Sequence, residues 1–274
     1  MLKKLKILLD SEIDPAFAAR ARIIFDQVQT GRPKKILDVG CGRGFYIKAL
    51  SIYSFPKEIY GIDTNEVYLR KATKDISDKR IKILNASAYS LPFSDSYFDF
   101  AICSEVLAHL KEDRRALKEM FRVVKSGGIL VVTVPSANFP FLWDPLNWIL
   151  ERLFGTHIKS GFFAGLWNQH IRLYSPEQIK KVVESAGVKV EKLESLTFWC
   201  LPFNHYLVNL VARYLHNQFI LGTPNSPLNK FTTHPSRPSL FNLAFNFVNW
   251  IDRLNDIWTP QNTGVSVFVK AVKT

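Results

Sequence analysis

Glycine occupies three alternate positions, Gly40, Gly42 and Gly44, directly after a short apolar run that ends at Val39. Residues without a side chain let the main chain bend sharply and approach a ligand closely. The spacing here is G-x-G-x-G, whereas nicotinamide dinucleotides bind to G-x-G-x-x-G. A glycine-rich turn between a strand and a helix can also serve purely steric needs. The glycines therefore indicate a ligand site at this turn but leave the ligand open.

Two carboxylates lie close to this turn in the sequence. Asp38 comes just before the first glycine, and Asp63 ends the next apolar run, in "IYGIDTN". A carboxylate at the end of the second strand can accept two hydrogen bonds from a ribose diol. The same arrangement serves every nucleoside cofactor, so Asp63 predicts a ribose and does not yet identify the cofactor.

Strands and helices are expected to alternate around these residues. Apolar runs predict strands at 36–39, 58–62, 81–84, 98–103, 128–134, 188–193 and 265–272. Helical periodicity predicts helices at 12–29, 45–52, 67–76, 114–124 and 176–186. The last helix opens with Ser175 as its N-cap, Pro176 in its first turn and Gln178 completing a capping box. Apolar strands separated by amphipathic helices predict a parallel sheet covered on both faces, which is an α/β fold.

Four segments carry a resemblance to a known family, in the family's order and spacing. They are "ILDVGCGRGFYIKAL", "IYGIDTN", "ASAYSLPFSDSYFDFAICSEVLAHL" and "FRVVKSGGILVVTVP". Over residues 35–135, and less closely through "HIRLYSPEQIKKVVESAGVKV", the chain resembles class I S-adenosylmethionine-dependent methyltransferases of the type 11 and ubiquinone/menaquinone-biosynthesis kind. The resemblance implies a Rossmann-like, seven-stranded, mostly parallel sheet with helices on both faces. It also implies S-adenosyl-L-methionine as cofactor and S-adenosyl-L-homocysteine as product.

The resemblance also implies where the cofactor binds. Its methionine end carries an amine, a carboxylate and a sulfonium; it has no phosphate. Asp38 is expected near the amine, Asp63 at the ribose hydroxyls and Thr64 beside the adenine. Ser87 occupies a position where the family often has Asp, so it is either a neutral, weaker partner of the adenine amine or an ordinary turn residue. The implied cofactor-binding residues are Asp38, Gly40, Cys41, Gly42, Gly44, Asp63, Thr64, Ser87, Ala88, Cys103 and Glu105.

Methyl transfer is a displacement at carbon, and a hydroxyl acceptor also needs a base. His109, in "CSEVLAHL", is the candidate base, although a histidine bonded to the backbone at a helix start is an equal alternative. Glu105 would share a face with His109 if this segment were helical, and is expected to order the loop beside the cofactor. His170, in "NQHIRLYSPEQ", is a second candidate. Arg172 and Tyr174 either reach over the crevice or join an insertion to the core.

Neither a metal nor a disulfide is expected. In ubiquinone-pathway O-methyltransferases the corresponding motif is Glu-x-x-Glu-His and can bind a divalent metal; here Ala108 replaces the second Glu. Cys41, Cys103 and Cys200 are widely spaced, which argues against a disulfide framework or a zinc site and fits a reducing cytosol. The start, "MLKKLKILLD", has no cleavage-like site, so a cytoplasmic location is expected.

Residues 1–274 are expected to form a single methyltransferase domain. It would comprise a cofactor-binding core at 30–136, substrate-cap insertions at 137–168 and 199–262, and the rest of the core at 169–198 and 263–274. The insertions fall where this family builds its acceptor pocket, and they are rich in large rings: Trp143, Trp148, Phe154, Phe162, Phe163, Trp167, Trp199, Phe203, Tyr206, Phe241, Phe245 and Trp250. These rings either pack on one another as a helical cap or form a lipophilic pocket or membrane-facing surface.

Three functions fit the sequence. The net charge of +12 and the aromatic insertions favour O- or C-methylation of a small lipophilic acceptor, such as an isoprenoid quinone precursor or a lipid, with peripheral membrane contact. Methylation of RNA or protein is the alternative, but the rings are not interleaved with Arg and Lys, and no NPPY-like tetrad follows the fourth strand, so nucleic acid is not expected. A non-catalytic S-adenosylmethionine-binding protein is the third. The sequence does not predict the oligomeric state.

Overall fold

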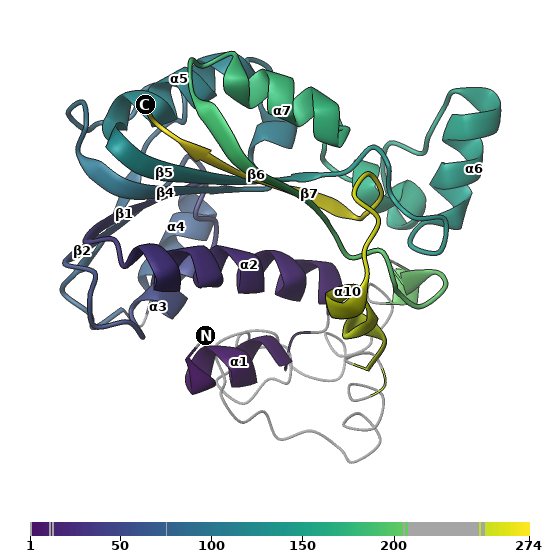
Figure 1. The fold of residues 1–274 in the computed structure, drawn as a ribbon, viewed down its shortest axis with the longest axis horizontal. Helices are drawn as coiled ribbons and strands as arrows, with labels where there is room; N and C mark the ends of the chain where they lie inside the picture. Colours follow the sequence, from purple (N-terminus) through teal and green to yellow (C-terminus); the bar gives the residue numbers. More distant parts are fainter. Residues whose placement is uncertain are drawn as a thin grey trace.

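The computed structural model describes residues 2–10, 12, 14–74, 76–204, 206–207, 247 and 250–274. Its centre is a seven-stranded sheet with the order β3-β2-β1-β4-β5-β7-β6 (Figure 1). The strands are β1 Lys35–Val39, β2 Glu58–Asp63, β3 Ile81–Asn85, β4 Phe98–Ser104, β5 Val124–Pro135, β6 Lys189–Leu196 and β7 Ser266–Val272. Strand β7 is antiparallel to β5 and β6, and the other pairs are parallel. The predicted α/β class and mostly parallel seven-stranded sheet are confirmed.

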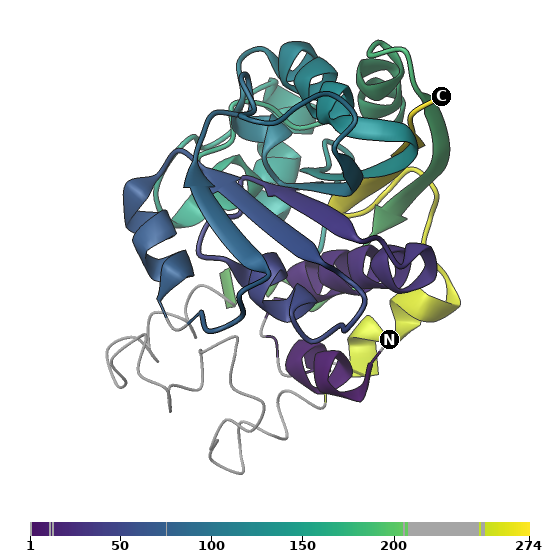
Figure 2. The same ribbon diagram turned by 90° about the vertical axis from the view of Figure 1, so that its left-hand side faces the viewer.

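Helices cover both faces of this sheet, as predicted. They are α1 Lys3–Asp10, α2 Pro15–Gly31, α3 Phe45–Leu50, α4 Glu66–Thr73, α5 Asp113–Val123, α6 Pro145–Phe154, α7 Pro176–Glu184 and α10 Leu254–Ile257, with 3-10 turns η1 Leu107–His109 and η2 Phe162–Trp167. In both views α5 and α7 lie on one side of the sheet, and α1, α2 and α3 lie on the other (Figure 1 and Figure 2). Helix α6 projects from the edge of this layered body (Figure 1).

Local sequence signals explain where the key helices begin. Asp14 caps α2 by accepting hydrogen bonds from the backbone N–H groups of Ala16 and Phe17. Ser175 and Gln178 form the predicted capping box at the start of α7. Helix α1 was not predicted, and it forms because three of its leucines lie on one side and are buried in the core: Leu5, Leu8 and Leu9.

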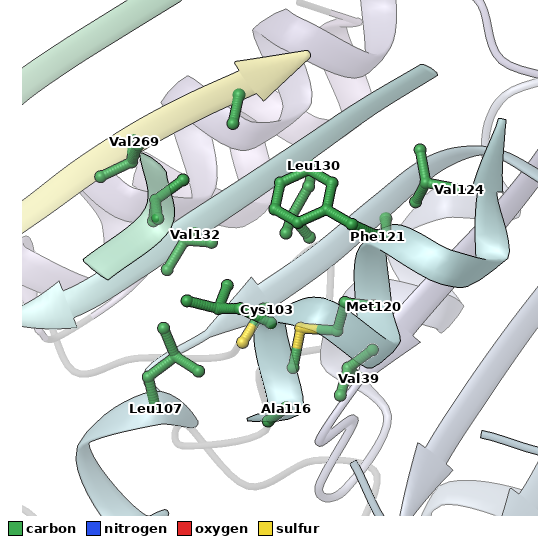
Figure 3. Close-up of a cluster of buried hydrophobic side chains, with 14 of the residues drawn as sticks. Val39, Cys103, Leu107, Ala116, Met120, Phe121, Val124, Leu130, Val132 and Val269 are labelled. Atoms are coloured by element: carbon green, nitrogen blue, oxygen red, sulfur yellow. The ribbon is translucent and has the colours of Figure 1, made fainter. Parts of the chain in front are cut away.

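Alternation along β5 divides the core into two halves. Leu130 and Val132 point to the half under α5 and α7, whereas Val131 points to the half under α2 and α3. Figure 3 shows the first half, in which Cys103 lies among side chains of the sheet and Met120 of α5. Helices therefore cover both faces of the sheet, and the ends of its strands remain accessible to a ligand.

The second insertion is described only at its ends. Phe241, Phe245 and most of the apolar arc expected between residues 240 and 254 lie outside the described residues. Within the part of the chain that the structure describes, no helix is long and apolar enough to cross a membrane.

Candidate cofactor and acceptor site

The strand order reverses between β1 and β4, which are neighbours in the sheet but not in the sequence. In open α/β sheets, ligands bind at the carboxyl ends of the strands beside such a reversal. Val39 at the end of β1 pairs with Cys103 of β4, and Cys103 pairs with Val132 of β5. The glycine turn after β1 and the loop after β4 therefore lie at the same edge of the sheet.

The first glycine of the turn is required by a close contact. Gly40 has φ +73°, and a Cβ atom there would lie 2.3 Å from Cγ2 of Val106, in the loop after β4. The N–H groups of Gly40 and Cys41 both donate to the carbonyl of Ile62, each at 2.8 Å. The turn is thereby fixed between β2 and the loop after β4, with its main chain exposed to a ligand at the strand ends.

Asp63 connects the glycine turn to β2. Its Oδ2 accepts a hydrogen bond from the N–H of Gly42 at 2.9 Å, and its Oδ1 accepts one from the N–H of Asn65 at 2.8 Å. Each carboxylate oxygen has a second lone pair, so both can still accept a hydroxyl. The predicted ribose acceptor therefore has a second role, because it also holds the glycine turn in place.

Asp38 is a buried carboxylate with an unused oxygen. Its exposed fraction is 1%, and Oδ2 has no hydrogen-bond partner among the described residues. Burial, followed by the nearby charge of Asp63, raises the pKa of Asp38 to about 8. A buried carboxylate without a partner is costly, so this position favours a ligand that brings a positive charge.

Arg20 of α2 was missed by the sequence analysis. Its guanidinium donates to the hydroxyl of Ser266 at 2.8 Å and lies 4.0 Å from Asp14. Its Nε is 3.8 Å from Oε1 of Glu105, and both atoms are buried without a hydrogen-bond partner in the described chain. Burial would lower the pKa of Arg20, but Glu105 and Asp14 outweigh it and raise that pKa. The signal was available: Arg20 interrupts the apolar face of its helix, one turn from Phe17 and Ile24.

Glu105 does not share a helical face with His109, contrary to the helical arrangement considered from the sequence. The only regular turn here, η1, spans Leu107–His109, and Glu105 lies before it in the left-handed region, with φ +61°. Its N–H donates to the carbonyl of Thr133 at 2.9 Å. A non-glycine residue in this region is strained, and such strain concentrates at functional sites.

Hydroxyl groups form the floor between these charges. Ser104 at the end of β4 shares hydrogen bonds with Thr133 at 2.9 Å and with the Tyr46 hydroxyl at 3.2 Å. Burial is the main cause that raises the pKa of Tyr46, which also interacts electrostatically with Arg20, Asp38 and Glu105. The bonded hydroxyls of Tyr46, Ser104 and Thr133 thus lie within the electrostatic influence of one cation and two carboxylates.

The two histidines proposed as bases lie together, with ring centroids 4.6 Å apart. Nδ1 of His109 bonds to the carbonyl of Gln169 at 2.9 Å, and Nδ1 of His170 bonds to the carbonyl of Leu166. A carbonyl can only accept, so each Nδ1 carries the proton and each neutral ring has an unprotonated Nε2. His109 is exposed, as the backbone-bonded alternative describes, and His170 is partly buried.

His170 is electrostatically coupled to Glu105 and Arg20. Burial, the largest cause, lowers the pKa of the His170 imidazole, against the opposing hydrogen bond to Leu166 and the charge of Glu105. Arg20 also acts on this ring. His170 is therefore neutral near pH 7 and lies within the electric field of the crevice.

Arg172 and Tyr174 join the insertion to the core and do not reach over the crevice. The Arg172 guanidinium donates to Asp113 Oδ2 at 2.9 Å, and the Tyr174 hydroxyl donates to the same oxygen at 2.7 Å. Arg172 also donates to the carbonyl of Lys111. These three side chains border a cavity of about 380 Å³ between α5 and α7, whose lining includes no residue of the glycine turn.

The other predicted contacts occupy different environments. Ser87 begins a turn, since its Oγ accepts from the N–H of Tyr89 at 3.2 Å, while Ala88 and Ser87 are both partly exposed. Cys103 is fully buried in the core, so any contact with a cofactor would come from its main chain. Thr64 is exposed after β2. The described residues contain no group of three or more His, Cys, Asp or Glu side chains arranged to hold a metal ion.

The fold defines an α/β protein of the Rossmann-like class, with its candidate site at the carboxyl ends of the strands. Residues 37–132 match the family described as methyltransferase domain. A demethylmenaquinone methyltransferase from Staphylococcus aureus is 31% identical over 60% of this chain and 71% of its own length. One from Geobacillus stearothermophilus is 29% identical over 62% of this chain and 76% of its own. The chain belongs to the S-adenosylmethionine-dependent methyltransferase family, as the sequence resemblance indicated.

Solved structures share the fold. Phosphoethanolamine N-methyltransferase 2 of Haemonchus contortus, in complex with S-adenosyl-L-methionine, has a TM-score of 0.53 and 18% identity, over 88% of this chain and 48% of that chain. The cyclase SpnF has a TM-score of 0.51 and 21% identity, over 87% and 75%. Because a cyclase and a methyltransferase share this architecture, the acceptor must be argued from the site.

Proposed function

We propose that the chain transfers a methyl group from S-adenosyl-L-methionine to a lipophilic, quinol-like acceptor. The fit of the cofactor rests on three buried polar atoms that have no hydrogen-bond partner in the described chain: Asp38 Oδ2, Arg20 Nε and Glu105 Oε1. A methionine end has a carboxylate for Arg20 and an ammonium and a sulfonium for the two acids. Asp63 would hold the ribose through its free lone pairs, and the turn at Gly40 would lie against the methionine. The buried Asp38 oxygen without a partner, together with an Arg20–Glu105 ion pair whose facing atoms are 3.8 Å apart and make no hydrogen bond, is the observation that supports cofactor binding most strongly.

The remaining sequence assignments for the cofactor stay predictions. Thr64 and the pair Ser87–Ala88 would flank the adenine. Cys41 and Gly44 would contribute through the main chain of the turn. When bound, the cofactor supplies an electrophilic methyl group on a positively charged sulfur.

The acceptor is proposed from the rings beside the crevice and from the relatives. Phe162 and Phe163 pack against Tyr206, with centroids 5.6 Å apart in both cases, and Trp167 stacks on His157 at 3.7 Å. These rings belong to the two insertions. Tyr206 is buried, whereas the other rings are partly or largely exposed, and exposed rings suit an aromatic, apolar substrate. The curated relatives are named as demethylmenaquinone methyltransferases. An isoprenoid quinol, methylated at oxygen or at a ring carbon, satisfies both observations.

His170 is proposed as the base. In either form of the reaction, removing the proton of the acceptor hydroxyl makes the acceptor more nucleophilic. Nε2 of His170 would take that proton, so that the acceptor could bond to the methyl group that a bound cofactor would supply, with the cofactor sulfur as leaving group. His109 lies farther toward solvent and would pass the proton outward. The backbone bond at Nδ1 holds the His170 ring in the tautomer that this step needs.

Replacing His170 with Ala is expected to lower kcat roughly 10²- to 10⁴-fold, the usual contribution of a general base, with little change in the binding of S-adenosylhomocysteine. Because the pKa of His170 is lowered, the acid limb of the wild-type kcat profile should fall below pH 6.5. The His170→Ala rate should partly recover at high pH, as the acceptor hydroxyl ionises on its own. A purely structural role would lower the rate equally at all pH values. His109→Ala is the matched comparison and should lose less activity.

The acceptor is tested by label transfer. With S-adenosylmethionine labelled in its methyl group and a reduced demethylmenaquinone carrying a short isoprenoid chain, we expect label in the organic phase and equimolar S-adenosylhomocysteine. Calorimetry with S-adenosylhomocysteine runs in parallel. Cofactor binding without label transfer would contradict the acceptor but leave the cofactor assignment intact. An absence of cofactor binding would contradict both and leave a protein that only retains the fold.

Peripheral membrane contact belongs to this proposal as well. An isoprenoid acceptor resides in a lipid bilayer, so an enzyme without a bound carrier must reach it at the bilayer surface. The net charge of +12 is consistent with an anionic surface.

A further inference from the structure

The outer side of α6 carries an apolar stripe. Leu146, Ile149 and Leu153 recur at the spacing of one helical face, and all three are exposed. The exposed fraction reaches 71% for Leu153 and 70% for the adjacent Phe154. Side chains of this size and exposure, adjacent on one helix, are uncommon on a monomer that contacts only water.

Neighbouring segments widen the stripe into a surface. Phe163 of η2 is 53% exposed, and its carbonyl accepts from the Asn147 side chain of α6 at 2.8 Å. Phe203 is 52% exposed, and its N–H donates to the carbonyl of Leu142, just before α6, at 2.8 Å. We call these residues together the α6 surface: Leu146, Ile149, Leu153, Phe154, Phe163 and Phe203.

The base of α6 is fixed to the rest of the chain. Asp144, which is fully buried, caps the helix by accepting from the N–H of Asn147 at 3.2 Å and also accepts from the Tyr206 hydroxyl. Asn147 in turn accepts from the N–H of Ile158 at 2.8 Å. The apolar side chains are therefore held outward by a buried polar network and are not the end of a loose helix.

The exposed charges around this surface are positive. Arg152 and Lys159 are exposed. Of the two acids of residues 137–168, Asp144 is buried, and Glu151 is partly exposed and accepts from the indole N–H of Trp167. Arg152 also lies over the ring of Trp148, 4.3 Å from its centroid. An apolar helical face bordered by cations is the pattern of a helix that lies in the interface of an anionic bilayer.

Helix α6 lies close in the chain to the residues of the proposed acceptor site. Strand β5, whose end borders the site, leads into α6, and α6 packs on η2. After η2 the chain reaches His170 within a few residues. Figure 1 shows α6 projecting on the side to which the end of β5 leads. A lipid surface at α6 would therefore lie beside the proposed acceptor pocket.

We propose that the α6 surface docks on an anionic lipid bilayer and so delivers the lipophilic acceptor to the crevice. The delivery step rests on the proposed function, while docking itself does not. Charge favours the bilayer over two other occupants, a second copy of the chain and residues 208–246. The positive rim repels its own copy, and residues 208–246 contain three basic residues and no acidic one.

The test is flotation of the full chain with vesicles of phosphatidylcholine alone or with phosphatidylglycerol added. We expect binding to the anionic vesicles at low salt. The double variant Leu153→Ser/Phe154→Ser should lower the partition coefficient at least about tenfold. Arg152→Gln and Lys159→Gln should each lower it roughly fivefold on anionic vesicles only. Ile52→Ser is the matched control, since Ile52 is 36% exposed in the connection from α3 to β2, away from α6.

Three results would overturn the proposal. They are no vesicle binding by the wild-type chain, equal binding by the double variant, and a concentration-dependent dimer in sedimentation that the double variant abolishes without any lipid effect. Calorimetry with S-adenosylhomocysteine on the same samples separates these results from a failure of the proposed function. The double variant should bind that ligand as the wild type does, which also shows that it is folded.

Discussion

Replacing Asp38 with Asn is expected to weaken the binding of S-adenosylhomocysteine roughly 100-fold at pH 8, because a charge-assisted contact in a buried site is lost. The oxygen that would meet the ligand ammonium is buried and unpartnered in the described chain. Asn keeps the size of the side chain but removes its charge. Folding should therefore be retained while the cation loses its partner.

The same residue should make binding depend on pH. The pKa of Asp38 is raised to about 8, so the carboxyl is mostly protonated at pH 6.5 in the free protein. A cationic ligand favours the ionised form, which lowers that pKa and releases a proton on binding. Affinity should then rise with pH from 6 to about 7.5, by at most about tenfold per unit, and fall again above about 8, where the ligand amine loses its proton.

Calorimetry in two buffers of different ionisation enthalpy measures this proton directly. At pH 6.5 an α-amine with a pKa of about 7.7–8.0 is already protonated, so the ligand contributes little. The wild type should release close to one proton, and Asp38→Asn should release none. Equal proton release by the two proteins would contradict the role given to Asp38.

Replacing Asp63 with Ala is expected to lower the affinity for S-adenosylhomocysteine on the order of 10²-fold. It should also lower the midpoint of thermal unfolding of the free protein. Two causes combine. The ribose loses its acceptor, and the turn loses the hydrogen bond from Gly42 to Asp63 at 2.9 Å. Asp63→Asn keeps one acceptor oxygen and should lie between Ala and the wild type in both measurements.

A ligand analogue separates the two causes. Removing the ribose hydroxyls from S-adenosylhomocysteine should greatly weaken its binding to the wild type. The same change in the ligand should hardly affect binding to Asp63→Ala, because the acceptor is already missing. The difference between these two losses is the coupling energy of the double cycle. Asp99→Asn is the matched control, because Asp99 also accepts from two backbone N–H groups, those of Lys34 and Lys35, but at the opposite end of β1. It should reduce stability without any coupling to the ribose. If the losses from Asp63→Ala and from removing the ribose hydroxyls were additive, Asp63 would not be the residue that binds the ribose.

The local signals in the sequence predicted the α/β class, whereas the family resemblance implied the seven-stranded, mostly parallel sheet; neither predicted that β7 is the antiparallel strand. The capping box at Ser175 and Gln178 depends on neighbouring residues only, and it forms as predicted. The order of the apolar runs also predicted that the glycine turn lies beside the ends of the other strands, because parallel strands bring their carboxyl ends together. Helix α1 was missed because, at eight residues, it is too short to show a clear helical period in the sequence.

The residues that complete the site were harder to predict, because long-range packing places them. Arg20 reaches Ser266 and Glu105 from a helix that begins far from both in the sequence. His170 lies near Glu105 only because the first insertion folds back over the loop after β4. Glu105 itself adopts a left-handed conformation that no local pattern indicated. Cys103 follows the apolar alternation of β4 into the core, which period-two reasoning does predict.

The central claim is that an adenosyl sulfonium cofactor binds at the glycine turn with its ribose on Asp63. A crystal structure of the chain with S-adenosylhomocysteine tests it most directly. We predict both ribose hydroxyls within hydrogen-bond distance of the Asp63 carboxylate, the ligand ammonium on Asp38 and its carboxylate on Arg20. A ligand bound elsewhere, or a ribose distant from Asp63 with the turn unoccupied, would contradict the account.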